Sequence, residues 1–137
     1  DRDWHGSYSM YDVVDKYVKP RTAGTGLGLA LLQNQTDPLE VNVMVSHAWA
    51  ENAEEFVKAL ELSVSEVDVL FICAFSLYQC QDGAGPSIVE QLGSHASESP
   101  FHRILEHIRG AGRRFGVLWR WEAYLRAIPG LLALMAV

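Results

Sequence analysis

Residues 41–49 read VNVMVSHAW, and the architecture of the chain follows from this stretch. Its three valines stand at alternate positions, which is the period of a β-strand, and both alternating sets are mostly apolar. A strand that is apolar on both faces is typical of the inside of a parallel sheet. We therefore expect Val41–Val45 to be an inner strand. Ser46, His47 and Trp49 then lie just beyond its carboxyl end, where ligands bind in open parallel sheets.

A helix is expected on each side of this strand in the sequence. Upstream, Ser9 and Asp12 have the spacing of a capping box, and Pro20 is expected to end the helix that they begin. Downstream, Asn52 is expected to cap a second helix, with Glu55 as its partner three residues on. The strand therefore has helical neighbours along the chain in both directions.

Strands and helices continue to alternate in the second half of the chain, although the pattern after Phe115 is ambiguous. The expected elements are a strand at Val67–Phe75, a short helix at Pro86–Leu92, a helix that begins at Pro100 after Ser99, and a strand at Phe115–Trp119 followed by a helix at Trp119–Ile128. Alternation of this kind predicts βαβ units, with a parallel sheet between two layers of helices.

Length and charge limit the classes of function. The chain has 137 residues, a length typical of one domain with a buried core, and its formal net charge is −6. A chain of that sign repels nucleic-acid backbones, so we expect no nucleic-acid partner. The candidate basic cluster straddles the end of a predicted helix, where cations are favourable in any case; its members are Arg103, Arg109, Arg113 and Arg114.

Cysteine content and hydropathy indicate a reduced, cytoplasmic setting. Two cysteines, Cys73 and Cys80, do not make a disulfide framework, and Cys73 is interpreted as a small buried hydrophobic residue. The first residues are charged and unlike a signal peptide, and no apolar run reaches the roughly 18–20 residues that a membrane span needs. We therefore expect a cytoplasmic protein with no membrane partner.

Two motifs give the chain a family resemblance. The first is a hydrophobic strand that ends in Ser-His-x-Trp at Ser46–Trp49, followed by the acidic Glu51. The second is the run WRWE at Trp119–Glu122. The chain resembles Toll/interleukin-receptor (TIR) domains, and above all a divergent TIR-like group of protists. In that group the second strand carries a Cys-Ala pair like Cys73–Ala74, and the domain ends in Trp-Cys-x-x-Glu.

This resemblance implies a fold. It covers roughly residues 10–125 and implies a flavodoxin-like (TIR-like) three-layer α/β sandwich with a mostly parallel sheet. Residues 1–39 are then an N-terminal helical extension, and residues 40–137 are the TIR-like domain. Trp119 stands three residues before Glu122 where the family has four, the motif cysteine is absent, and residues 110–117 look shortened. The later elements of a full TIR domain have no room after Gly130, which indicates a domain truncated or rearranged at its C-terminal end.

The resemblance also implies two functions of different classes. One is a signalling module that works by homotypic association, with other TIR-like domains or with itself. The other is an NAD glycohydrolase, for which NAD is a nucleotide substrate and no cofactor is needed. In that enzyme Glu122 stabilises the oxocarbenium-like ribose, Trp119 or Trp121 stacks on the base, and the Ser-His-x-Trp residues line the pocket. Because the Trp-to-Glu spacing is altered, association is the preferred function.

Each of these candidate sites also has a structural interpretation. Ser46 and His47 are adjacent, so in an extended strand they face opposite ways and do not form a nucleophile–base pair. They can instead satisfy backbone groups in a turn while Trp49 packs on the sheet. Glu122 can be a surface residue of a terminal helix.

Three further patterns are not interpreted as sites. His102 and His107 are five residues apart, whereas two metal ligands on one helix face need a spacing of four, so no metal site is expected. Residues 24–28 read GTGLG but follow no strand, as a dinucleotide loop must, and are interpreted as a flexible loop. The acidic cluster that begins at Glu51 is interpreted as a solvated helix start.

Overall fold

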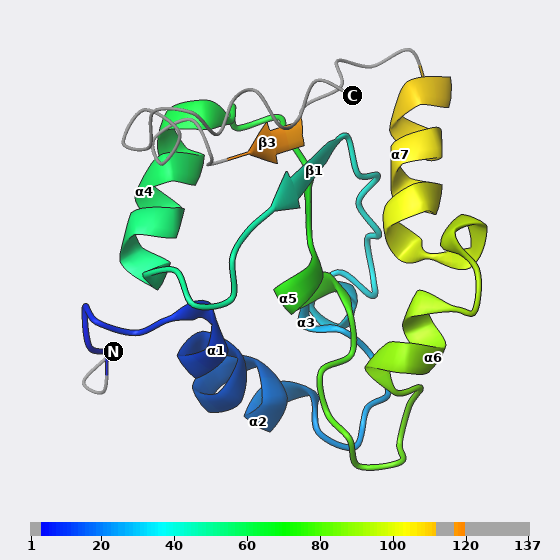
Figure 1. Ribbon diagram of the computed structural model, residues 1–137, viewed down its shortest axis with the longest axis horizontal. Coiled ribbons are helices and arrows are strands. Elements are labelled where there is room, and N and C mark those ends of the chain that lie inside the picture. The colour runs from blue at the N-terminus through cyan, green and yellow to red at the C-terminus, as the bar shows by residue number, and fades with distance from the viewer. Residues whose placement is uncertain (1–3, 112–116, 120–137) are drawn as a thin grey trace, which may run out of the picture.

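The structure, a computed structural model, describes residues 4–111 and 117–119 of the chain. In these residues helices precede and separate the strands of a parallel sheet, so the α/β class is confirmed (Figure 1). The elements in chain order are α1 (Met10–Val13), the π-helical turn η1 (Val14–Val18), α2 (Lys19–Thr22), α3 (Leu29–Gln33), β1 (Val43–Ser46), α4 (Ala53–Ser63), β2 (Leu70–Ile72), α5 (Cys73–Ser76), α6 (Ile88–Leu92), the 3₁₀ turn η2 (Ala96–Glu98), α7 (Pro100–Gly110) and β3 (Val117–Trp119).

The sheet has the strand order β2-β1-β3, and both pairings are parallel. Met44 lies opposite Phe71 in β2 and opposite Val117 in β3. The prediction of an inner parallel strand is therefore confirmed for β1, which begins two residues later than expected and ends at Ser46.

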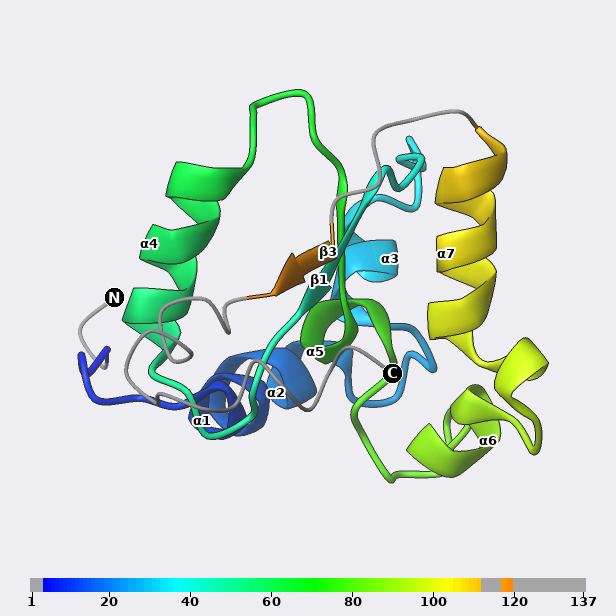
Figure 2. The same ribbon diagram turned by 45° about the horizontal axis from the view of Figure 1, so that its top comes forward.

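Side chains of the strands alternate between two hydrophobic clusters, one on each face of the sheet. Val43, Val45 and Ile72 pack with Met10 and Phe56, from α1 and α4. On the other face lies a cluster formed with Ile108 of α7; its strand members are Met44 and Phe71. Helices cover both faces, as the continuous apolar strand predicts (Figure 2).

The first helix begins as predicted but does not end at Pro20. The Ser9 hydroxyl accepts from the Asp12 amide, and the Asp12 carboxylate accepts from the Ser9 amide, which confirms the capping box. The chain then passes through the π-helical turn η1 and continues through Pro20 to Thr22. Pro20 lies in the first turn of α2, directly after the π-helical turn, where the hydrogen bonds already depart from the i→i−4 pattern that a proline interrupts. The predicted stop is therefore wrong.

The predicted second strand is too long at both ends. Before it, the Asp68 carboxylate accepts from the Ser65 amide at 2.8 Å and closes a turn, so β2 starts only at Leu70. After it, the chain turns directly into α5 at Cys73. The α4 cap is confirmed, because the Asn52 side chain accepts from the Glu55 amide at 3.0 Å.

The second half keeps the predicted order. α6 ends at Leu92 and is capped by Gly93, which has a φ of 75°, and α7 begins at Pro100 after Ser99. β3 lies within the predicted strand Phe115–Trp119. The helix predicted at Trp119–Ile128 lies outside the described residues. Within residues 4–111 and 117–119, every helix is too short or too polar to cross a bilayer.

Candidate functional site

The carboxyl ends of the three strands meet at one edge of the sheet, which we call the carboxyl edge. β1 ends there at Ser46, and Trp119, the last residue of β3, lies directly opposite it. Val45 lies opposite Ile72, so the residues that leave β1 and β2 also emerge side by side. In parallel sheets this edge is the usual place for a ligand.

His47 leaves β1 at this edge and turns its imidazole into the protein. The side chain has no exposed surface, and the ring lies 5.3 Å from the Trp49 ring and 5.5 Å from the Phe56 ring, between centroids. Its Nε2 atom lies 3.3 Å from Cys73 Sγ, whereas the buried Nδ1 atom makes no hydrogen bond. Nδ1 faces Glu51 Oε1 at 3.7 Å.

Cys73 and Glu51 both differ from their predicted roles. Cys73 was expected to be a buried hydrophobic residue; it does pack against the cluster of Met44 and Phe71, but it is only partly buried and its Sγ contacts His47. Glu51 was expected to be solvated, but its side chain is only 15% exposed and its Oε1 accepts from the Ala48 amide at 3.0 Å. Both side chains thus lie beside the buried imidazole of His47, with Cys73 Sγ 3.3 Å from Nε2 and Glu51 Oε1 3.7 Å from Nδ1.

The shifts in pKa at this cluster come mainly from burial. Burial lowers the pKa of His47 below its ordinary value, with an opposing contribution from the Ala48 backbone. Burial raises the pKa of the Cys73 thiol, and the backbone N–H of Ala74 beside Sγ partly offsets it. Both shifts favour the uncharged forms, so a neutral thiol faces a neutral imidazole.

Trp49 and Trp119 are the other described members of the predicted site. The Trp49 ring stacks on Tyr11 of α1 at 5.3 Å and is half-buried against the core, and the amide of Tyr11 donates to the Trp49 carbonyl. Trp119 reaches the carboxyl edge through its backbone pairing with Ser46. Trp121 and Glu122 lie outside the described residues.

Sequence reasoning missed the contact between Cys73 and His47, although a signal for it exists. His47 directly follows β1 and Cys73 directly follows β2, and the carboxyl ends of adjacent parallel strands lie side by side. Finding the contact required the knowledge that β1 and β2 are neighbours in register. Periodicity in the sequence does not supply that order.

Other described features fall outside the predicted site. A cavity of about 490 Å³ lies beside α2 and is lined by Lys19, Pro20, Ala23 and Gln79–Asp82. His102 and His107 contact the carboxylates of Glu106 and Glu40, at 3.3 and 3.2 Å. Within the described part of the chain, no three His, Cys, Asp or Glu side chains converge in a way that suits a metal ion.

Comparisons with protein-family models, with curated proteins and with solved structures gave no significant match. The resemblance to TIR domains therefore stays a prediction.

Proposed function

We propose that the chain is a TIR-like domain of flavodoxin-like architecture that acts by homotypic association, through the edge opposite the carboxyl edge. This amino edge, at the top of Figure 2, is formed by the α3–β1 and α4–β2 connections. The observation that carries the proposal is the exposure of three large apolar residues: Leu39 (55% exposed) and Val67 (80%) in the two connections, and Leu62 (90%) in the last turn of α4. Single exposed apolar residues are ordinary, and it is their presence on both connections and on the adjoining helix end that supports an interaction surface here.

Hydrogen bonds join the two connections of the amino edge. The Asn42 amide donates to the Val69 carbonyl at 3.0 Å, and the Val69 amide donates to Asn42 Oδ1 at 2.8 Å. Asn42 Nδ2 also donates to the Val67 carbonyl at 3.4 Å. A surface that is already ordered in this way loses less conformational entropy when a partner binds than a flexible loop does.

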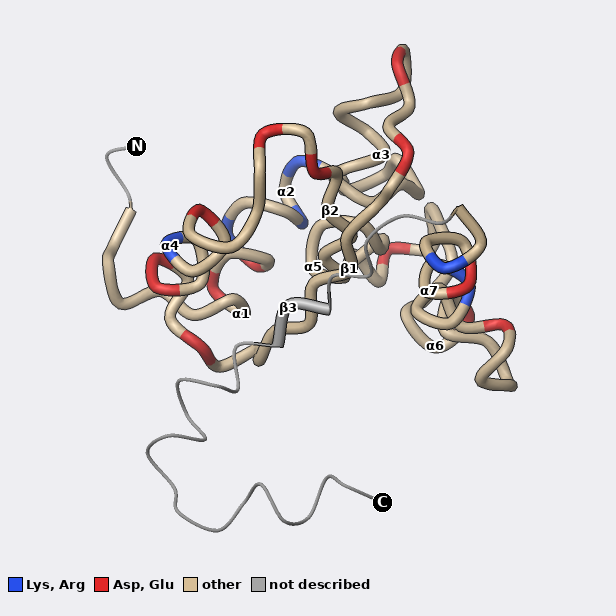
Figure 3. The backbone as a smooth tube through the Cα atoms, turned by 90° about the horizontal axis from the view of Figure 1, so that it is seen from above, with Lys and Arg blue, Asp and Glu red and all other residues tan. Residues whose placement is uncertain are grey.

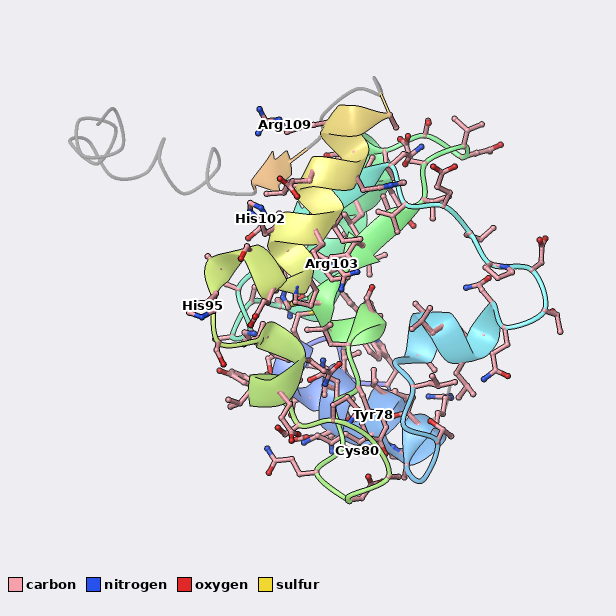
Figure 4. All side chains as sticks on the ribbon, turned by 90° about the vertical axis from the view of Figure 1, so that its right-hand side faces the viewer. Tyr78, Cys80, His95, His102, Arg103 and Arg109 are labelled. Atoms are coloured by element: carbon pink, nitrogen blue, oxygen red, sulfur yellow. The ribbon has the colours of Figure 1, made fainter. Side chains whose placement is uncertain are left out.

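Charge supports a second copy of the chain as the partner. Figure 3 shows acidic positions on both connections of the amino edge, among them the exposed Asp37 and Glu66. α7 exposes Arg103 and Arg109 along its length (Figure 4). In a two-fold dimer the acidic edge of each copy can face α7 of the other, which is the self-complementary arrangement of such interfaces.

Association is tested with the double variant Leu62→Ser/Val67→Ser, measured by sedimentation equilibrium over a range of concentrations. The wild-type mass is expected to rise from monomer toward dimer, and the double variant to need at least about tenfold more protein, because each lost apolar side chain removes about 1.5–3 kcal/mol of burial. Val89→Ser is the matched control, since Val89 is 77% exposed on α6 and away from the amino edge. A wild type that stays monomeric at every concentration contradicts the proposal.

A second candidate function, cleavage of the nicotinamide–ribose bond of NAD, is favoured by a different observation. β3 runs parallel to β1 and its last residue, Trp119, lies opposite Ser46. Glu122 follows Trp119 by three residues in the sequence, and the resemblance to TIR domains implies that it is the catalytic carboxylate. Such a carboxylate stabilises the positive charge that develops on ribose as nicotinamide departs.

This second candidate is tested by incubating the chain with NAD and measuring nicotinamide by chromatography. Release by the wild type, reduced at least about a hundredfold in Glu122→Ala, is the expected result for an electrostatic catalyst. Glu66→Ala is the control, because Glu66 is an exposed carboxylate in the α4–β2 connection at the opposite edge. Release of nicotinamide by the wild type at the background rate rules out the NAD-cleaving activity and does not affect the proposal of homotypic association.

A further inference from the structure

The carboxyl edge brings a thiol, an imidazole and a carboxylate into one row. Cys73 Sγ lies 3.3 Å from His47 Nε2, and His47 Nδ1 lies 3.7 Å from Glu51 Oε1. The three residues come from two segments: the β1–α4 turn supplies His47 and Glu51, and the start of α5 supplies Cys73. The order thiol, imidazole, carboxylate is the arrangement by which a base activates a nucleophile while a third group orients the base.

Packing in the protein interior fixes the position of the imidazole in this row. Its ring contacts the rings of Trp49 and Phe56, and its side chain is fully buried. Glu51 is fixed in turn, because its Oε1 accepts from the Ala48 amide and its own carbonyl accepts from the Met10 amide of α1. The buried Nδ1 makes no hydrogen bond in this state, so the ring keeps one polar atom free to bond with the carboxylate that it faces.

The protonation states suit a base rather than a preformed ion pair. With a neutral ring and Nδ1–H directed to Glu51, the lone pair of Nε2 points toward the thiol. Catalytic hydrogen bonds are often long before substrate binds, so 3.7 Å between Nδ1 and Oε1 is compatible with this role. The groups that face His47 are thus Cys73, from the start of α5, and Glu51, from the turn before α4.

The second cysteine of the chain provides an internal contrast. Cys80 is 8% exposed, and its Sγ donates to the Lys19 carbonyl at 3.4 Å and lies 3.6 Å from Thr22 Oγ1. None of these neighbours is a base. Cys80 therefore has the surroundings of a structural thiol, whereas Cys73 is partly exposed and faces an imidazole.

We propose that Cys73 is a nucleophile for activated acyl groups, such as esters or thioesters, with His47 as its base and Glu51 as the residue that positions the base. The thiol proton passes to Nε2 as Sγ bonds to the carbonyl carbon. The bond to the leaving group then breaks, and the alcohol or thiol that departs takes the proton from Nε2. Water, deprotonated by His47, hydrolyses the acyl-thioester and restores the thiol. The reaction requires neither Glu122 nor NAD, so it goes beyond both functions proposed above.

The first test compares the two cysteines in the intact wild-type chain with p-nitrophenyl acetate. Peptide mapping by mass spectrometry gives the acylation rate of each thiol, and the urea-unfolded chain gives the reference rate of each. Cys73 is expected to react at least about tenfold faster in the folded than in the unfolded chain, and Cys80 much more slowly in the folded chain. A folded-state rate for Cys73 at or below its unfolded rate overturns the proposal, with no variant required.

The base is tested with His47→Gln, and Cys80→Ala is the matched control. The burst of p-nitrophenolate is expected to persist in Cys80→Ala and to slow on the order of a hundredfold in His47→Gln, the usual contribution of a general base. The unfolding midpoint of each variant is measured alongside. Where His47→Gln does not fold, the comparison of Cys73 with Cys80 in the wild type decides the question alone. An undiminished burst in folded His47→Gln overturns the role of the base.

Glu51 is tested as a positioning residue through the pH dependence of the reaction. Glu51→Gln keeps an oxygen for the Ala48 amide but removes the charge that favours the imidazolium, so the pH–rate profile is expected to shift to lower pH and the rate to fall. Glu55→Gln is the control, because it removes a carboxylate from the first turn of α4, the helix that follows Glu51. A pH–rate profile of Glu51→Gln that coincides with that of the wild type overturns the positioning role. Loss of a carboxylate that is merely structural would not shift this profile.

Discussion

At the level of single residues, hydrogen bonds to a few carboxylates determine how the loops close. Asp82 is the main example, since its carboxylate accepts from the Tyr78 hydroxyl at 2.6 and 2.7 Å, from the Gly24 amide at 2.8 Å and from the Ala84 amide at 3.0 Å. It thereby ties the loop after α2 to the loop before α6. Figure 4 shows its partner Tyr78 beside the helices of the N-terminal segment.

Asp82→Asn is expected to lower the urea midpoint at neutral pH and to reduce the decrease of that midpoint as the pH is lowered. The Tyr78 hydroxyl, and then the Gly24 and Ala84 amides, hold the pKa of Asp82 below its ordinary value. A lowered folded-state pKa contributes stability above about pH 4, where the unfolded carboxyl is ionised, and that stability is lost as pH falls through the folded-state pKa. Urea unfolding from about pH 7 to about pH 2 measures this pH-dependent contribution to the free energy of unfolding. Asp37→Asn, at an exposed loop position, is the control. Identical acid profiles for wild type and Asp82→Asn contradict this role.

Tyr78 titrates in the opposite sense. Burial, and then the neighbouring Asp82, raise the pKa of Tyr78 to about 12. The folded state therefore favours the neutral phenol, whose contribution to stability is complete below about pH 10 and is lost as pH rises through the folded-state value. The tyrosinate absorbance of the folded chain is expected to lose its highest-pH step in Tyr78→Phe but not in Tyr11→Phe, a control at a residue that is 57% exposed. A step that survives in Tyr78→Phe belongs to another tyrosine.

At the level of elements, short helices meet closely where glycine allows it. Gly28 is the N-cap of α3, and a Cβ there would lie 2.2 Å from the Ser76 carbonyl oxygen at the end of α5. The contact joins the segment before β1 to the segment after β2. In the sequence Gly28 is recognisable only as part of a glycine-rich loop, because the carbonyl that it contacts belongs to Ser76, 48 residues further on.

Gly28→Ala is expected to cost about 1–3 kcal/mol of unfolding free energy, the usual cost of an overpacked contact. Gly110→Ala is the matched control, since a Cβ added there, at the end of α7, would have no neighbour within 4 Å. At Gly110 alanine is expected to be neutral or to stabilise the helix by up to about 1 kcal/mol. Chemical denaturation of the two variants measures the difference, and equal midpoints would mean that α3 and α5 do not pack as described.

At the level of the whole molecule, the N-terminal helices share their core with the sheet. Met10, Val14 and Val18 lie in the same buried cluster as Val45 and Phe56. The first amides of α1, which have no partner within the helix, donate to the carbonyls of Trp49 and Glu51 in the turn beside the carboxyl edge. The N-terminal segment thus supports both the core and the candidate site.

Met10→Ala is therefore expected to destabilise the whole chain by about 2–5 kcal/mol, as other truncations of fully buried side chains do. Met10 is 1% exposed. Val89→Ala, at a 77% exposed position, is expected to change the unfolding free energy by no more than about 0.5 kcal/mol. Urea unfolding followed by tryptophan fluorescence and by circular dichroism is the measurement. A Met10→Ala midpoint equal to that of Val89→Ala would mean that residues 1–39 fold apart from the sheet.

Much of the local structure could be predicted because its determinants are close together in the chain. The capping box of Ser9 and Asp12 and the cap by Asn52 span three residues each, and the alternating valines give the strand its two buried faces. Predictions failed at the ends of elements, where a second local feature changed the boundary. A π-helical turn directly precedes α2, so the helix near Pro20 already departs from the i→i−4 hydrogen-bond pattern that a proline interrupts. The Asp68 carboxylate closes a turn with Ser65 and thereby delays the start of β2.

Amino-acid order alone established the inner parallel strand, the caps and the α/β class, because periodicity and capping depend on neighbours within one or two turns of chain. Folding in three dimensions established the row of Cys73, His47 and Glu51 and the shared core of α1 with the sheet. His47 and Cys73 are 26 residues apart, and they meet only because β1 and β2 pair in parallel with Val45 opposite Ile72. No local pattern encodes which strand becomes a neighbour, since that choice depends on how both faces of the sheet are buried at once.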